Sequence, residues 1–208
     1  RAGMEIHGYC DERFAAVREA FEKNFAERGD VGASFAATVE GEYVVDIWAG
    51  HADAARTRPW TEDTIVNVYS TTKTMTFLCA LMLADRGELD LDAPVVNYWP
   101  EFGANGKDRI PVRFLLSHTA GVPGFSRPFS NAELYNWEFA CADLASQEPW
   151  WEPGIQSGYH AITQGYLIGE VIRRITGRTI GTYFREEVAE RIGVDFHIGV
   201  PPSEFNRI

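Results

Sequence analysis

The chain contains little cysteine and little lysine, and it lacks a long apolar run. Its three cysteines are widely spaced and form no C-x-x-C pair, which argues against a disulfide scaffold and against a zinc site. The longest apolar run, 77–84, is far shorter than the roughly 20 residues of a membrane-spanning helix. Lysine occurs only at Lys23, Lys73 and Lys107. With so few lysines, one that completes a short motif is seldom there by chance.

The chain also lacks the basic character of a nucleic-acid-binding protein. Its formal net charge is −11 at pH 7, whereas nucleic acids and anionic membranes attract clustered lysine and arginine. There is no H-E-x-x-H, P-loop or G-x-G-x-x-G motif, and the five histidines show no metal-ligand spacing. No secretory signal pattern is visible at the start. We therefore expect a soluble cytoplasmic protein with no metal, no organic cofactor, and no nucleic-acid or membrane partner.

Hydrophobic periodicity predicts a helix and a hairpin in the first quarter of the chain. Apolar residues recur every three or four positions over 11–28, which is typical of an amphipathic helix. Apolar residues then alternate with smaller or polar ones over 31–39 and 43–47. The two runs flank a Glu40-Gly41 turn and predict an antiparallel hairpin.

Helices are expected to dominate the rest of the chain. A short extended run is predicted at 64–68, followed by a helix from Ser70 to Arg86 that ends at Gly87. This helix is apolar almost all round, which is typical of a helix buried at the centre of a fold. Four further helices are predicted, at 112–117, 131–146, 161–176 and 179–192.

The predicted fold class is α+β, an antiparallel sheet with flanking helices plus a mainly helical subdomain. We assign residues 1–70 to the N-terminal part of the α/β subdomain and residues 71–208 to the helical subdomain. Two or three strands are too few for a stable sheet beside so many helices. We therefore expect the C-terminal part of the sheet to be missing from this chain, and to be supplied most simply by a C-terminal segment of the same protein.

Ser70 and Lys73 form an S-x-x-K motif at the start of the expected buried helix. Side chains three residues apart lie on one face of a helix, and the N–H groups at a helix start can stabilise a developing oxyanion. Partial burial beside Met75 and Phe77 would disfavour the ammonium form of the lysine. The motif therefore indicates Ser70 as a nucleophile and Lys73 as the base that accepts its proton.

The motif alone leaves a structural interpretation open. Composition predicts about 0.1 chance occurrences of S-x-x-K in a chain with three lysines and eight serines. Ser70 could instead cap the helix, and Lys73 could extend to solvent. Other nucleophiles are weaker, because no G-x-S-x-G elbow occurs and Ser34 lies within a predicted strand.

Three segments together resemble the serine β-lactamase-like superfamily. They are 68–73, 86–95 and 112–123, which read VYSTTK, RGELDLDAPV and VRFLLSHTAGVP. The sequence is most similar to the S-x-x-K esterases related to class C β-lactamases and D-alanyl-D-alanine carboxypeptidases. The resemblance runs from about Asp11 to the end of the chain. It implies a β-lactamase/transpeptidase-like fold with Ser70 and Lys73 as catalytic residues.

The same family places a tyrosine, often in Y-x-N, beside the serine and the lysine. The run Gly158-Tyr159-His160-Ala161 precedes a stretch that is similar to the family's next helix. The resemblance therefore implies that Tyr159 passes a proton to the leaving group; a merely packed aromatic is the alternative. Ala161 replaces the family's asparagine, which helps to hold amide substrates, and this departure favours simple carboxylic esters.

The family's third motif lies on a strand that reads K-T-G, H-x-G or W-G-G, and none of the strands predicted for this chain carries it. In the family that strand forms one wall of the site and supplies a second oxyanion-hole N–H. The resemblance therefore implies that the site needs a segment beyond Ile208. Trp150 and Trp151 either line an acyl pocket or anchor a core.

These observations predict a serine hydrolase, a carboxylesterase that acts on small carboxylic esters through an acyl-enzyme on Ser70. Its partner would be a small-molecule ester, bound in a groove between the two subdomains. One alternative is a β-lactamase or D-Ala-D-Ala peptidase that applies the same chemistry to amides. The other is a non-catalytic binding or sensing member of the same fold.

Overall fold

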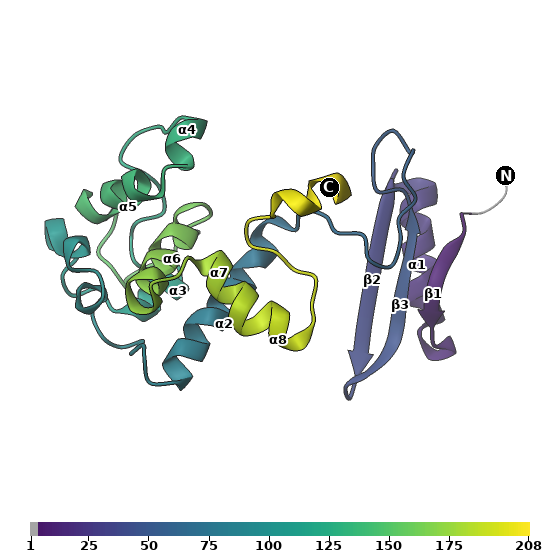
Figure 1. Cartoon of the computed structure of the whole chain (residues 1–208), viewed down its shortest axis with the longest axis horizontal. Helices are drawn as coiled ribbons and strands as arrows, with labels where there is room; N and C mark the ends of the chain where they lie inside the picture. Colours follow the sequence, from purple (N-terminus) through teal and green to yellow (C-terminus); the bar gives the residue numbers. More distant parts are fainter. Residues whose placement is uncertain (1–3) are drawn as a thin grey trace. The chain divides into compact units, whose positions relative to one another are not determined.

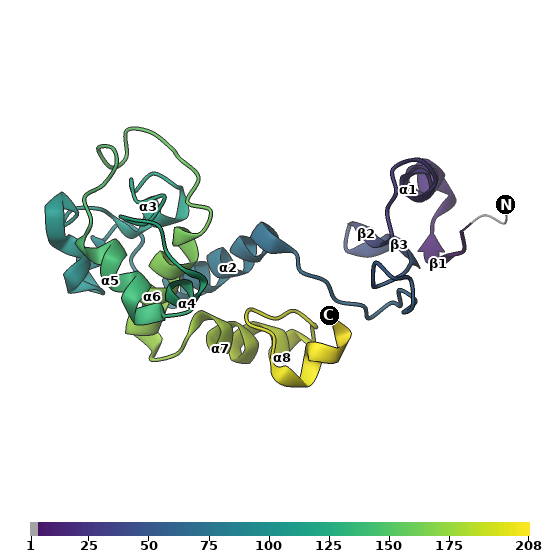
Figure 2. The same ribbon diagram turned by 90° about the horizontal axis from the view of Figure 1, so that it is seen from above.

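The structure, a computed structural model, describes residues 4–208, which form two compact units (Figure 1, Figure 2). The first unit comprises the chain up to Asn67 together with Val200–Ile208, and the second runs from Val68 to Gly199. Each unit has its own hydrophobic core. None of the helices in the described range 4–208 is long and apolar enough to cross a bilayer. The subdomain boundary at residue 70 stays a prediction.

The first unit is a three-stranded antiparallel sheet with one long helix. Its elements are β1 (Ile6–Cys10), η1 (Glu12–Phe14), α1 (Ala15–Glu27), β2 (Gly32–Val39), β3 (Glu42–Gly50) and η6 (Pro202–Arg207), and the strand order is β1-β3-β2. Glu40 and Gly41 have positive φ angles, 52° and 83°, as a two-residue type I′ hairpin turn requires. Phe21 of α1 belongs to the same core as Val45 and Ile47 of β3. The predicted helix and hairpin are thus confirmed.

Strand β1 is absent from the sequence predictions because Gly8 interrupts its apolar pattern. In the structure, Gly8 pairs with Ile47 of β3. Its φ is +94°, and a Cβ at this position would overlap the Asp46 carbonyl oxygen. Gly8 therefore both breaks the apolar pattern that would predict β1 and permits the close approach of β1 to β3.

The second unit consists of helices. Its elements are η2 (Tyr69–Thr71), α2 (Thr72–Asp85), η3 (Val95–Asn97), η4 (Pro100–Gly106), α3 (Val112–Leu116), α4 (Asn131–Leu134), α5 (Trp137–Ser146), α6 (Thr163–Thr176), α7 (Ile180–Phe184), the π-helical turn η5 (Arg185–Ala189) and α8 (Glu190–Ile192). Cys79 and Leu83 of α2 lie in one core with Leu167 and Val171 of α6. Helix α2 therefore lies against α6, and this packing positions the residues at the start of α2.

Several predicted elements need correction. No strand forms at 64–68, and a single turn of 3-10 helix leads into α2 instead. The helix predicted over 131–146 is broken into α4 and α5, because the Asn136 side chain caps α5 by accepting a hydrogen bond from the Phe139 N–H. Helix α2 is not buried all round, since Leu78 and Leu81 are 38% and 51% exposed.

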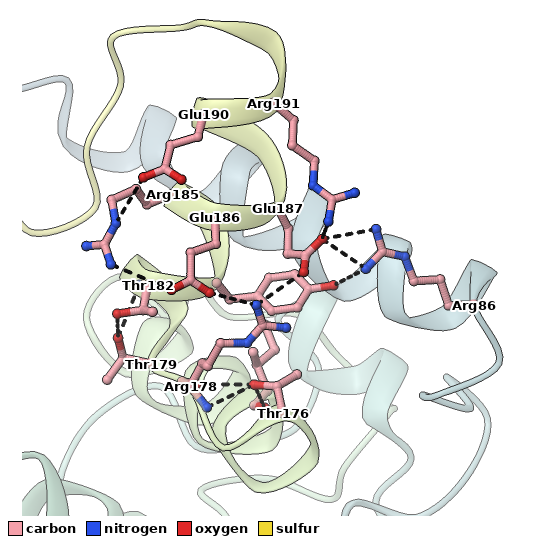
Figure 3. A network of polar contacts seen from close by, with 12 residues as sticks. Arg86, Thr176, Arg178, Thr179, Thr182, Arg185, Glu186, Glu187, Glu190 and Arg191 are labelled. Atoms are coloured by element: carbon pink, nitrogen blue, oxygen red, sulfur yellow. Dashed lines mark hydrogen bonds and ion pairs between the residues drawn. The ribbon is translucent and has the colours of Figure 1, made fainter.

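A network of ion pairs connects the C-terminal end of α2 to α7 and α8 (Figure 3). Glu187 lies at its centre and pairs with Arg86 at 3.3 Å, Arg178 at 3.2 Å and Arg191 at 2.8 Å. Arg86 also donates a hydrogen bond to Tyr183. Single exposed ion pairs stabilise little, whereas several that share one carboxylate hold their elements in register. The network therefore fixes the C-terminal end of α2, whereas Ser70 lies at its N-terminal end.

A buried carboxylate links α5 to α6. Glu170 is 2% exposed and accepts hydrogen bonds from Arg173 and Arg174, one turn further along α6, and from the Trp137 indole of α5. Burial raises the pKa of this carboxyl, but the hydrogen bonds from these three side chains outweigh burial and lower its pKa to about 2. The ionised carboxylate is therefore favoured in the folded state.

Replacing Glu170 with glutamine is expected to lower the free energy of unfolding by about 3 kcal/mol at pH 7. The pKa of the carboxyl falls from its ordinary 4.5 to about 2 on folding. Its stabilisation is therefore complete above pH 4.5 and is lost as the pH falls toward 2. Urea unfolding at pH 7, 4 and 3 should show that the difference in free energy of unfolding between wild type and Glu170→Gln decreases as the pH falls. Glu138→Gln, on the exposed side of α5, is the control, and equal stability of Glu170→Gln and wild type at pH 7 contradicts the argument.

Candidate active site

Ser70 lies on an exposed 3-10 turn that leads directly into α2. The preceding residue, Tyr69, has a φ of 48°. This left-handed conformation is strained for a non-glycine residue, by about 1–3 kcal/mol, and such strain is concentrated at functional sites. The strained turn presents Ser70 to solvent at the positive end of the helix dipole, where free N–H groups favour negative charge.

Two side chains from distant parts of the chain meet at the Ser70 hydroxyl. Lys73 Nζ donates to Ser70 Oγ at 3.0 Å, and the Tyr159 hydroxyl donates to the same oxygen at 2.6 Å. Lys73 Nζ also donates to the Ala161 carbonyl at 2.8 Å. The structure thus brings together the three residues that the sequence analysis selects, although Tyr159 is 89 positions away from Ser70. Their catalytic roles stay a prediction.

Lys73 does not extend to solvent, which was the structural alternative to a role as base. Its half-buried side chain turns back, with Nζ 4.8 Å from the centre of the Tyr159 ring. The hydrogen bond to Ser70 and the neighbouring Lys73 ammonium lower the pKa of the Tyr159 phenol. A lower pKa makes the phenolate form of Tyr159 more accessible near neutral pH, and a phenolate can accept the proton of a serine hydroxyl. The arrangement can therefore move a proton away from Ser70 along two routes.

Ala161, the departure from the family pattern, contributes through its backbone. Its carbonyl holds Lys73, a contact that does not depend on which side chain occupies the position. The methyl side chain leaves no amide to bind a polar substrate group. The substitution therefore preserves the position of the lysine and removes a polar contact for the substrate.

The two tryptophans have different surroundings. Trp151 is half-buried, donates through its indole N–H to the Thr119 carbonyl at 3.3 Å, and lies edge-on to His160 with ring centroids 5.9 Å apart. A Cβ on Gly158 would overlap or crowd its ring. Trp150 is 60% exposed. For Trp151 the core-anchor interpretation is therefore favoured, since it supports the loop that carries Tyr159.

Sequence reasoning misses two residues of the site, His118 and His160. The ring of His118 lies 4.9 Å from the ring of Tyr159, and His160 is fully buried. His118 lies in the segment 112–123, one of the three that carry the family resemblance. The residues that it contacts around Tyr159, however, are about 40 positions further along the chain. Spacing along the chain carries no information about such contacts, so only the fold reveals them.

Comparison with known proteins agrees with this geometry. The chain matches a protein-family model described as Beta-lactamase over residues 17–208. It is 41% identical, over 204 residues, to "Esterase/beta-lactamase LipL" of Mycobacterium tuberculosis, and the alignment covers 98% of this chain and 47% of LipL.

Two solved structures are similar over almost the whole chain. A penicillin-binding protein homolog from Caulobacter crescentus has 47% identity and a TM-score of 0.93, and the match covers 98% of this chain and 55% of that one. A family VIII carboxylesterase has 49% identity and a TM-score of 0.92, with 98% and 56% of the two chains covered. The α+β fold predicted from the sequence is confirmed. The chain spans about half the length of these relatives.

Proposed function

Because the chain belongs to the beta-lactamase family, we propose that it carries the nucleophile half of a serine hydrolase that cleaves small carboxylic esters. One observation carries this proposal. Ser70 Oγ lies within hydrogen-bond distance of both Lys73 Nζ and Tyr159 Oη. A hydroxyl with two proton-transfer partners on an exposed, strained turn is arranged for nucleophilic attack.

The reaction proceeds in two steps. Ser70 Oγ attacks the ester carbonyl carbon while its proton passes to Lys73 in its neutral amine form, assisted by Tyr159. The tetrahedral intermediate then collapses, the bond to the alcohol oxygen breaks, and Tyr159 returns the proton to that oxygen. A water molecule attacks the acyl-enzyme, giving up a proton to the same pair, and the acid leaves as Ser70 regains its hydrogen. N–H groups at the start of α2 stabilise the oxyanion in both steps.

Esters are favoured over amides by Ala161, which offers no side-chain amide to a peptide-like substrate. The relatives include a protein named as an esterase, LipL, and a family VIII carboxylesterase. Amide hydrolysis is the second candidate, because LipL is named an esterase and a β-lactamase. Faster turnover of a cephalosporin than of p-nitrophenyl esters would favour the amide reaction.

The proposal includes a further segment of the same protein. The chain spans about half of each relative, and strand β2 carries the exposed apolar residues Phe35 and Val39. An exposed apolar strand is a surface that native proteins usually cover. The further segment would add strands to the sheet and a second oxyanion-hole N–H to the site.

The proposal is tested by covalent labelling of the full-length protein. An alkyl fluorophosphonate should add one phosphonyl group to Ser70 with loss of fluoride, seen as a single mass increment by intact-protein mass spectrometry and located by peptide mapping. Brief treatment with a p-nitrophenyl ester should release nitrophenol and give a transient acyl adduct. Absence of both adducts in a folded full-length protein contradicts the hydrolase and leaves the non-catalytic binding protein.

A further inference from the structure

The loop that carries Tyr159 is held on both sides by histidines. We infer that His118 and His160 form a clamp that positions Tyr159 against Ser70 and that opens when His118 takes up a proton. The inference rests on the proposed function, because it assigns a positioning role within that site. It concerns two residues to which the mechanism above gives no part.

His118 binds the backbone on each side of Tyr159. Its carbonyl oxygen accepts a hydrogen bond from the Gly158 N–H at 2.9 Å, and its ring atom Nδ1 accepts one from the His160 N–H at 2.9 Å. The His118 ring also lies 4.9 Å from the Tyr159 ring. With the N–H groups of Gly158 and His160 both bound, His118 holds the backbone that carries Tyr159 on each side of this residue.

The ring of His160 contacts the same loop from its buried side. Its side chain is fully buried. Nε2 accepts a hydrogen bond from the Val122 N–H at 3.1 Å, and Nδ1 lies 2.6 Å from the Gly158 carbonyl. The backbone on one side of Tyr159 is therefore bound twice, by its N–H to His118 and by its C=O to His160.

These contacts determine the tautomer of each ring. A backbone N–H can only donate, so Nδ1 of His118 and Nε2 of His160 must both be unprotonated. The remaining proton then lies on Nε2 of His118 and on Nδ1 of His160, where it is donated to the Gly158 carbonyl. The side-chain nitrogen of Gln164 lies 3.3 Å from His118 Nε2, but it donates to the Leu115 carbonyl at the shorter distance of 2.9 Å. The shorter hydrogen bond from the His160 N–H therefore decides which nitrogen of His118 is unprotonated. The two rings are thus held neutral in opposite tautomers.

Protonation of His118 would break the clamp. A second ring proton on Nδ1 would face the His160 N–H, two donors against each other. The titratable groups that the structure places against His118 are Lys73 of α2, together with Tyr159 and His160 of the loop before α6. These groups are cationic or neutral and offer the imidazolium no counter-charge. Burial, and then the charge of Lys73, lower the pKa of His118, and burial likewise lowers that of His160.

Two variants separate the hydrogen bond from the backbone conformation. His118 has a φ of 60°, which asparagine and glycine both tolerate. In His118→Asn the side-chain oxygen can accept the His160 N–H in place of Nδ1, and it does not titrate. In His118→Gly the acceptor is lost. At pH 8, His118→Asn should keep kcat within about threefold of wild type, and His118→Gly should lose about tenfold or more in kcat with little change in KM.

The pH profile tests the switch. Wild-type kcat should fall with the uptake of one proton at a pH below 6.5, the ordinary pKa of histidine, and His118→Asn should lack this acid limb. If kcat of His118→Asn falls at the same pH as kcat of wild type, the proposed proton switch is wrong. Equal kcat of His118→Gly and wild type at pH 8, with the fold verified by circular dichroism, overturns the clamp.

The clamp can also be tested by a measurement that does not depend on catalytic activity, so that failure of the clamp and failure of the proposed function are distinguished. Long-range ¹H–¹⁵N spectra of the full-length protein should show the Nε2–H tautomer for His118 and the Nδ1–H tautomer for His160. Two rings in the same tautomer, or free titration of His118 near 6.5, overturn the clamp even in an active enzyme. The expected tautomers in a protein that hydrolyses no ester overturn the proposed function alone.

Discussion

Substitution of Ser70 by alanine is expected to lower kcat for p-nitrophenyl ester hydrolysis by at least about 10⁴-fold. Without the hydroxyl, the carbonyl has no nucleophile, and Lys73 and Tyr159 have no proton to move. What remains is the polarising effect of N–H groups at the start of α2, which gives only slow attack by water. Because Ser70 is exposed, the variant should fold normally and keep KM.

The measurement is steady-state kinetics of the full-length wild type and Ser70→Ala, with substrate depletion followed over hours to detect the residual rate. Ser203→Ala, at an exposed serine of the first unit, serves as the matched control and should match wild type. Retention of more than about 1% of wild-type kcat by Ser70→Ala would show that another group is the nucleophile.

Replacement of Lys73 by methionine is expected to lower kcat by about 10³-fold, as loss of a general base does. Methionine keeps most of the chain length and its packing. It removes the amine that lies 3.0 Å from Ser70 Oγ and 2.8 Å from the Ala161 carbonyl. Tyr159 then loses the cation beside its ring, so that both routes for the serine proton are weakened.

The variant Lys73→Arg tests whether Lys73 acts as a base or only through its positive charge. A guanidinium stays protonated at any accessible pH, so this variant keeps the positive charge but cannot accept the serine proton. We expect Lys73→Arg to be as impaired as Lys73→Met, in kcat and in the rate of phosphonate labelling. Activity of Lys73→Arg close to that of wild type would mean that Lys73 acts only through its charge. Lys23→Met, at an exposed lysine of α1, is the control for loss of a lysine.

Local sequence was sufficient for features whose partners lie within a few residues. The helix and hairpin of the first unit follow from the period of apolar residues and from the Glu40-Gly41 turn. Ser70 and Lys73 meet because three positions of helical backbone bring their side chains to one face. The resemblance to the serine β-lactamase-like superfamily, read from three short segments, is confirmed by the family match over residues 17–208.

Tertiary structure decided what depends on packing between distant segments. The approach of Tyr159 to Ser70, the binding of Lys73 by the Ala161 carbonyl, and the contacts of His118 and His160 join parts of the chain that are about 40 to 90 positions apart. Period and spacing describe only neighbours along the chain, and they cannot express the direction in which a loop side chain points. The pairing of Ser70 with Lys73 was therefore determined by the sequence itself, whereas the place of Tyr159 and the groups that hold it were decided by how α2, α6 and the loop before α6 pack together.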